Sequence, residues 1–325
     1  NLDYNKIYDK ITQTKVSEVT IKTKVDFDSG KEIASKLLDG VYLSTNIERN
    51  YIYDSLLCQV LGFISSDNYG QSGLEAVYNN YLKGTNGKVL TDTDIYGKEI
   101  NNTYSKYLEP IAGLNLQLTV DYFIQASVEK TVKSAQEATQ AKSVSCMVID
   151  PLSGEILASA ITPSYDLNSP PRNNAAELTA LSRNSLIMDA FEPGSIFKVF
   201  ALSYCIENHL FDENHLFYCP GYRIIDGQKI KCWKTKGHGS QTLMEGVANS
   251  CNCVFMDIAN KMGLDNFYDA LSLFGYGSKT GVDFLSESSG IIMNKNNVKT
   301  VDLVRMGFGQ AIAVTPIQIL TATAS

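Results

Sequence analysis

The stretch Phe191-Glu-Pro-Gly-Ser-Ile-Phe-Lys198 decides the interpretation of this chain. Its Pro-Gly pair is followed by an apolar run over 196–206, a pattern that predicts a helix starting near this point. Ser195 and Lys198 are spaced i, i+3, which places hydroxyl and amine on one helix face. A serine hydroxyl is a weak nucleophile until a base takes its proton, and a buried lysine can act as that base. We therefore predict Ser195 as a nucleophile and Lys198 as its general base.

Spacing alone does not identify such a site, because the same pattern occurs elsewhere. Ser127-Val-Glu-Lys130 repeats it and reads as an ordinary amphipathic helix face. Ser-x-Asn, a second candidate pattern, occurs four times, and only Ser250-Cys-Asn252 follows the nucleophile stretch and directly precedes a predicted helix. Order and context therefore select Ser250 and Asn252.

Periodicity and turn residues predict the elements around these residues. Asp121 is expected to cap a helix from Tyr122 toward Ala138, and Asp226-Gly227 is expected to form a hairpin tip. The remaining expected elements are strands over 116–120, 145–150 and 155–160 and helices over 30–38, 72–81, 242–248 and 253–262.

The nucleophile stretch and Ser250-Cys-Asn252 resemble the first two motifs of penicillin-binding transpeptidases. Further segments that resemble class B members of this family lie along most of the chain: Gly70-Gln-Ser-Gly-Leu-Glu75, Leu82-Lys-Gly84, Leu118-Thr-Val-Asp121, Asp150-Pro-Leu-Ser-Gly-Glu-Ile-Leu-Ala158, Gly307-Phe-Gly-Gln310 and Thr315-Pro316. The resemblance implies an α/β fold with a mostly antiparallel sheet flanked by helices over 113–325. It also implies an elongated α+β pedestal over 1–112.

The resemblance implies a role for each of the four polar residues. Ser195 would attack the D-Ala-D-Ala stem peptide of peptidoglycan, form an acyl-enzyme and supply one oxyanion donor through its backbone N–H. Lys198 would be the general base, Ser250 would relay a proton to the leaving amine, and Asn252 would hold the substrate amide and Lys198. A second stem peptide would accept the acyl group, and a β-lactam would stop at the ester.

Lys279-Thr280-Gly281 matches the family's third motif but sits in a loop that resembles a non-catalytic turn of the family. The third motif is expected on a sheet-edge strand beyond the segment from Gly307 to Thr315. The chain ends at Ser325. We therefore expect this piece to lack the third motif and the closing C-terminal strands.

Four of the seven cysteines lie close together in sequence with His238: Cys219, Cys232, Cys251 and Cys253. Zinc takes four N or S ligands, and we predict Cys219, Cys232, His238 and Cys253. Cys253 is preferred because the middle residue of Ser-x-Asn, here Cys251, is often Cys in relatives that bind no metal. A Cys219–Cys232 disulfide and free packing thiols are the two alternatives.

The formal net charge of −7 argues against a nucleic-acid partner, and basic pairs such as Lys229 and Lys231 are expected on a solvated face. No apolar run is long enough to span a membrane. The resemblance implies the extracytoplasmic face of the cell membrane, with an N-terminal anchor outside this chain, and a membrane glycan polymerase of the SEDS type as partner. Division, elongation and spore-wall synthesis all stay open as its setting.

Two other functions compete with the transpeptidase. A serine β-lactamase shares Ser-x-x-Lys but must deacylate with water, and the long N-terminal segment argues against it. A non-catalytic scaffold or β-lactam sensor would keep the fold without turnover. Intact Ser195, Lys198, Ser250 and Asn252 argue against the scaffold.

Overall fold

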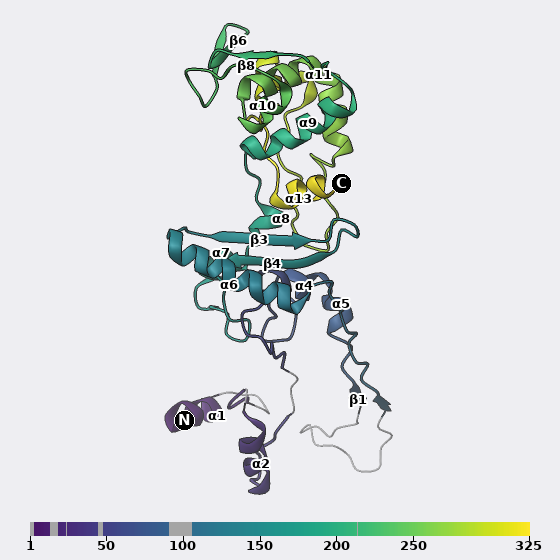
Figure 1. The fold of residues 1–325 in the computed structure, drawn as a ribbon. Coiled ribbons are helices and arrows are strands. Elements are labelled where there is room, and N and C mark those ends of the chain that lie inside the picture. Colours follow the sequence, from purple (N-terminus) through teal and green to yellow (C-terminus); the bar gives the residue numbers. More distant parts are fainter. Residues whose placement is uncertain (1–2, 14–18, 24, 45–47, 91–105, 213) are drawn as a thin grey trace. The chain divides into compact units, whose positions relative to one another are not determined.

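The computed structural model describes residues 3–13, 19–23, 25–44, 48–90, 106–212 and 214–325 (Figure 1). Backbone contacts divide the chain into two compact units, residues 1–49 with 83–114 and residues 50–82 with 115–325. The single boundary expected at 112/113 stays a prediction. Residues 50–82 make their contacts within the second unit. Within the described ranges, we find no helix whose length and hydropathy would let it span a bilayer.

Among its described residues, the first unit holds two helices and a pair of short strands. They are α1 (Tyr4–Gln13), α2 (Phe27–Ser35), β1 (Lys88–Leu90) and β2 (Lys106–Leu108). Helix α2 begins after Asp26, whose carboxylate accepts the N–H of Ser29 and satisfies a free donor of the first turn. The helix expected over 30–38 therefore exists, but it starts and ends earlier in the chain. Strands β1 and β2 pair antiparallel.

In the second unit, an antiparallel pair, β3 (Val144–Ile149) and β4 (Ile156–Thr162), is covered by α6 (Tyr122–Thr139), as Figure 1 shows. Asp121 caps α6 by accepting the N–H groups of Phe123 and Ile124, which confirms that prediction. Fully buried Gln125 fixes the helix to the sheet, because its side-chain amide exchanges hydrogen bonds of 2.8 and 3.0 Å with the backbone of Ser159.

The strand expected over 116–120 does not form. Thr119 Oγ1 donates to Ile156 O over 2.7 Å and Asp121 N donates to Leu157 O over 3.0 Å, so the segment runs beside β4. No ladder of paired backbone groups accompanies these contacts in the described residues. The alternating polarity of residues 116–120 therefore does not lead to backbone pairing with a neighbouring strand.

The rest of the second unit is mainly helical. Its helices are α3 (Cys58–Leu61), α4 (Gly73–Val77), α5 (Asn79–Leu82), α7 (Ala175–Ser182), α8 (Ser185–Met188), η1 (Gly194–Phe197), α9 (Lys198–Glu207), α10 (Leu243–Ala248), α11 (Asn252–Leu273), η2 (Lys295–Asn297), α12 (Thr300–Met306) and α13 (Pro316–Ala324). The largest core cluster joins α9, α11 and α12, with Val254, Ile258 and Ala259 of α11 completely buried. This core supports the two turns that carry the candidate site.

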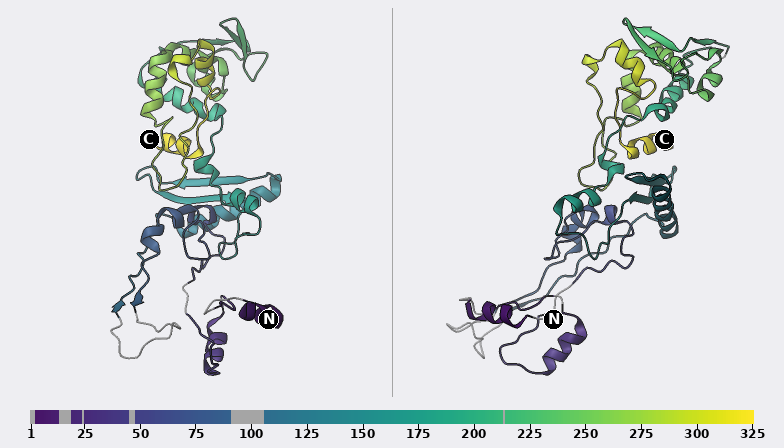
Figure 2. Two further views of the ribbon diagram at one scale, coloured as in Figure 1. Left: turned by 180° about the vertical axis from the view of Figure 1, so that it is seen from behind. Right: turned by 90° about the vertical axis from the view of Figure 1, so that its left-hand side faces the viewer.

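Four short strands lie beside this helical core (Figure 2): β5 (Phe217–Cys219) pairs with β8 (Gly239–Gln241), and β6 (Tyr222–Ile225) pairs with β7 (Gln228–Lys231). Asp226 and Gly227 have φ of 49° and 76°. Two successive positive φ values are what a tight two-residue hairpin turn requires. The predicted hairpin tip is confirmed.

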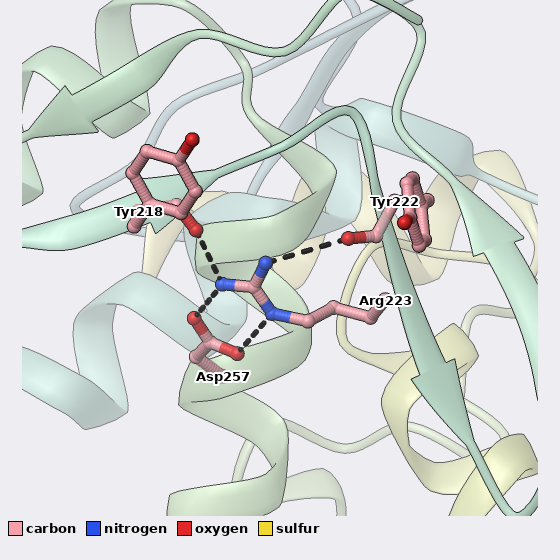
Figure 3. A network of polar contacts seen from close by, with 4 residues as sticks. All are labelled: Tyr218, Tyr222, Arg223 and Asp257. Carbon is pink, nitrogen blue, oxygen red and sulfur yellow. Dashed lines mark hydrogen bonds and ion pairs between the residues drawn. The ribbon is translucent and has the colours of Figure 1, made fainter.

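An ion pair fastens the β6–β7 hairpin to α11. Arg223 of β6 donates to both carboxylate oxygens of Asp257, over 3.0 and 2.7 Å, and also to the carbonyls of Tyr218 and Tyr222 (Figure 3). The carboxylate of Asp257 raises the pKa of Arg223 further above its usual range. Because Arg223 points toward α11, the alternate residues of the ladder point away from it.

Candidate active site

Ser195 lies in the 3-10 turn η1, directly before the α-helix α9, and its side chain is exposed. The α-helix expected over 196–206 therefore starts at Lys198, two residues later than predicted. Gly194 N donates to Gly309 O over 2.9 Å, which ties the turn to the Gly307–Gln310 segment. A Cβ on Gly309 would lie 2.1 Å from Gly194 O, so only glycine permits this approach.

The Ser250–Asn252 turn joins α10 to α11. Ser250 has φ of 47°, and its N–H donates to Val247 O over 2.8 Å. Cys251 is completely buried and precedes the first residue of α11, Asn252. The left-handed residue turns the chain sharply, so that the side chains of Ser250 and Asn252 reach the same amine.

That amine belongs to Lys198, which is 4% exposed. Its Nζ donates to Ser250 O over 2.8 Å, to Ser250 Oγ over 2.9 Å and to Asn252 Oδ1 over 2.8 Å. Ser250 Oγ in turn lies 3.2 Å from Ser195 Oγ. The structure thus brings together all four polar residues that the sequence selected, in one chain of contacts from Lys198 through Ser250 to Ser195.

Burial shifts the protonation equilibrium of this amine. Loss of solvation lowers the pKa of Lys198 to about 8, against the opposing charge effects of Cys232 and Cys251. An amine with such a pKa is partly neutral near pH 7 and can accept a proton. The arrangement is therefore chemically able to activate a hydroxyl.

The loop with Lys279, Thr280 and Gly281 contains no strand in the structure. Buried Glu287 closes it: its carboxylate accepts from Thr280 N over 2.5 Å, from Thr280 Oγ1 over 2.6 Å and from Gly281 N over 3.1 Å. Both backbone N–H groups and the hydroxyl group are thus bonded within the loop itself.

A second cluster, of sulfur and imidazole groups, adjoins the Ser250–Asn252 turn. Ligand atoms of Cys219, Cys232, His238 and Cys251 all lie within 4.8 Å of one another. The three thiols are almost fully buried, and His238 Nε2 is a buried atom that no described group hydrogen bonds. All seven cysteines are described and each is a free thiol. Three sulfurs and one imidazole form a group that can hold a metal ion.

The prediction of Cys253 as the fourth ligand has to be corrected. The structure places Cys251, not Cys253, beside Cys219, Cys232 and His238. Cys251 stands before the helix, where the turn directs its side chain into the group, whereas Cys253 is one residue further along α11. The hydrogen bond between the two thiols lowers the pKa of Cys251 and raises that of Cys253, because Cys253 donates and Cys251 accepts. Zinc binds cysteine as the thiolate, the form that a lowered pKa favours in Cys251.

Sequence reasoning missed one functional neighbour of this site. Asn252 Nδ2 donates to Lys231 O over 3.4 Å, so the β6–β7 hairpin holds the amide of Asn252. The sequence does place this hairpin between the nucleophile stretch and Ser250-Cys-Asn252. Its residue types alone give no indication that its backbone contacts Asn252.

Comparisons with known proteins agree with this arrangement. Family models for the penicillin-binding protein transpeptidase domain and for the penicillin-binding protein dimerisation domain match residues 144–325 and 1–118. Stage V sporulation protein D of Bacillus subtilis is 33% identical over the whole chain and half of its own length. Peptidoglycan D,D-transpeptidase FtsI of Escherichia coli is 28% identical over 93% of the chain and 50% of its own length.

Among solved structures, penicillin-binding protein 3 of Mycobacterium tuberculosis complexed with aztreonam has a TM-score of 0.72 and 26% identity. The match covers 85% of this chain and 57% of that one. The chain therefore spans about half the length of the relatives it matches. With a transpeptidase-domain match over more than half of its residues, the chain belongs to the family of class B penicillin-binding proteins.

Proposed function

We propose that this chain carries the acylation site of a D,D-transpeptidase that cross-links peptidoglycan. Ser195 Oγ attacks the carbonyl carbon of the penultimate D-Ala while Lys198 takes the hydroxyl proton. The C–N bond then breaks, and the proton passes through Ser250 Oγ to the leaving amine of the terminal D-Ala. An amine of a second stem peptide attacks the ester, forms the new amide and releases Ser195. The continuous contact from Lys198 through Ser250 to Ser195 carries this proposal.

Each further residue has a defined task in this scheme. Asn252 holds the amine of Lys198 through its Oδ1, and the N–H of its side chain that does not donate to Lys231 O can donate to a substrate carbonyl. The backbone N–H of Ser195, in the turn η1, supplies an oxyanion donor. A β-lactam enters the first step as a mimic of the peptide; the related protein of M. tuberculosis is known with aztreonam.

A fluorescent penicillin tests the nucleophile and separates the competing functions. Full-length protein should be labelled, with label that persists for hours, and Ser195→Ala should abolish labelling. Ser127→Ala is the matched control, because Ser127-Val-Glu-Lys130 has the same spacing on the exposed face of α6. Label lost within minutes indicates a β-lactamase, and an unlabelled wild-type protein indicates a scaffold.

We also propose that Cys219, Cys232, His238 and Cys251 hold a structural zinc ion. Bound zinc would supply four fixed bonds and no Lewis-acid step. Because Cys251 stands between Ser250 and Asn252, the ion would brace that turn against the hairpin. Metal analysis should find zinc in the wild-type protein and in Cys253→Ser, with strong loss in Cys219→Ser and Cys251→Ser. Equal metal content in all four proteins contradicts the assignment.

We infer that the protein works on the extracytoplasmic face of the cell membrane, where its substrate is assembled, together with a SEDS-type glycan polymerase. The family resemblance is the support for both. Exposed cysteines engineered on α6 should react with a membrane-impermeant maleimide in intact spheroplasts. Reaction only after lysis contradicts this location.

The partnership is tested by co-purification. The polymerase should co-purify with the full-length protein, and deletion of residues 1–112 should abolish this.

A further inference from the structure

A cavity of about 540 Å³ is lined by residues that take no part in the proton path described above. Its walls include Lys229 and Lys231 of β7, Arg305 of α12, Gln310 and Glu192. Neither the acylation chemistry nor the sulfur–imidazole group uses these side chains. A space of this size admits several residues of an extended peptide.

Two of its cations come from one strand face. Lys229 and Lys231 are two positions apart on β7, so both point away from α11, while Ile230 between them is buried. Lys229 Nζ stands 3.9 Å from the ring centroid of Tyr222, which holds the amine in place. The expectation of a merely solvated face is therefore incomplete, since the exposed lysines border a cavity.

The third cation comes from a distant part of the chain. Arg305 Nη2 donates to Gln228 Oε1 over 3.3 Å, which sets the guanidinium beside the hairpin. The one carboxylate among the lining residues, that of Glu192, accepts the N–H of Ala311 over 2.9 Å. Three cations thus face one acid that already has a partner, in a chain whose formal net charge is −7. The local charge selects an anion.

Both walls of the cavity are bonded to the reacting residues. On one side, Lys231 O accepts from Asn252, which also holds Lys198. On the other, Gln310 directly follows Gly309, whose carbonyl accepts the N–H of Gly194 beside the nucleophile. A peptide with its scissile bond at Ser195 therefore has its flanking residues within reach of the cavity.

We propose that this cavity binds a carboxylate of the peptidoglycan stem peptide, through Lys229, Lys231 and Arg305. The assignment rests on the proposed transpeptidase function and specifies its substrate. Stem peptides carry free carboxylates on their γ-linked glutamate and diamino acid, and amidation removes that charge. A guanidinium and two amines match a carboxylate in charge and donor number. The cavity thereby discriminates acidic stem peptides from amidated ones.

The test compares two synthetic pentapeptides that end in D-Ala-D-Ala, one with a free glutamate carboxylate and one with the carboxamide. Full-length wild-type protein should release D-Ala from the acidic peptide with the higher kcat/KM. In Lys229→Gln this preference should fall about fivefold, mainly through KM, as expected for exposed charge pairs. The rate for the carboxamide peptide and the rate of penicillin acylation should stay unchanged.

Lys279→Gln is the control, because it removes the same charge at an exposed position outside the cavity lining. Arg305→Gln gives a second variant from another element, should the hairpin variant fold poorly. Offering the same two peptides as acceptors to a preformed acyl-enzyme tells whether the recognised carboxylate belongs to the donor or the acceptor strand.

Equal kcat/KM for the two peptides in the wild-type protein, as donors and as acceptors, would overturn the carboxylate site while leaving the transpeptidase intact. An equal loss in the control variant would overturn it too, since only the overall charge would then matter. Absence of D-Ala release from both peptides, with no penicillin acylation, would sink the proposed function and this assignment with it.

Discussion

The amine of Lys198 donates to the hydroxyl oxygen of Ser250 over 2.9 Å, and it is buried while doing so. The same hydroxyl stands 3.2 Å from Ser195 Oγ. Ser250 therefore occupies the position of a proton relay between the buried amine and the exposed nucleophile. The first two predictions test the amine of Lys198 and the hydroxyl of Ser250.

Acylation should depend on the protonation of Lys198. Burial lowers the pKa of this amine to about 8, so its neutral, basic form grows as the pH rises through that value. The rate of penicillin acylation should rise about tenfold per pH unit below about pH 8 and level off above it. Stopped-flow measurements between about pH 6 and pH 9 check this. A flat profile would rule out Lys198 as the titrating base, and Lys198→Met should remove the dependence.

Removing the relay should slow the reaction without preventing binding. Ser250→Ala keeps the turn backbone but deletes the hydroxyl between Lys198 and Ser195. General acid–base groups contribute about a hundredfold or more, so the acylation rate constant should fall by about that factor. The dissociation constant of the initial penicillin complex should change little. A variant that acylates at the wild-type rate would show that the proton takes another route.

Gly309 should be intolerant of a side chain. A Cβ there would meet Gly194 O at 2.1 Å and displace the turn that carries Ser195. Gly154 is the matched control, because its φ of 77° is close to the 79° of Gly309 but nothing lies within 4 Å of its Cβ. Gly154→Ala should cost about 1 kcal/mol of unfolding free energy and keep acylation. Gly309→Ala should lose more stability and acylate slowly; equal behaviour of the two variants would contradict the close approach.

The ion pair of Arg223 and Asp257 should stabilise the hairpin. The two side chains are 22% and 32% exposed, so Asp257→Asn leaves a half-buried guanidinium with weaker partners. We expect a loss of about 1–3 kcal/mol in urea unfolding, and slower acylation because Lys231 O holds Asn252. The exposed pair of Arg183 and Asp189 is the control, and Asp189→Asn should cost less than about 1 kcal/mol. Similar losses in both variants would argue against the anchoring role.

Local signals in the sequence predicted several elements correctly, because the residues that decide them are neighbours in the chain. Asp121 caps α6 with donors two and three residues away, and Asp226-Gly227 forms its turn alone. The four polar residues could be selected because Ser-x-x-Lys and Ser-x-Asn each have a fixed order and context.

Features that depend on contacts between residues far apart in the chain could not be predicted from local sequence signals. The choice between Cys251 and Cys253 follows from the left-handed backbone of Ser250, which spacing does not reveal. Lys229 and Lys231 looked solvated because Arg305, which completes the charged cavity, lies on α12. The segment over 116–120 lies beside β4 but forms no ladder with it in the described residues, and alternating polarity alone does not specify strand pairing.

The measurement that tests the central claim most directly is identification of the residue that carries the acyl group. Full-length protein is incubated with a depsipeptide analogue of the stem peptide, quenched in acid, digested and mapped by mass spectrometry. We predict the acyl group on Ser195 in the wild-type protein and no stable adduct in Ser195→Ala. An adduct on any other residue, or undiminished acylation of Ser195→Ala, would contradict the account.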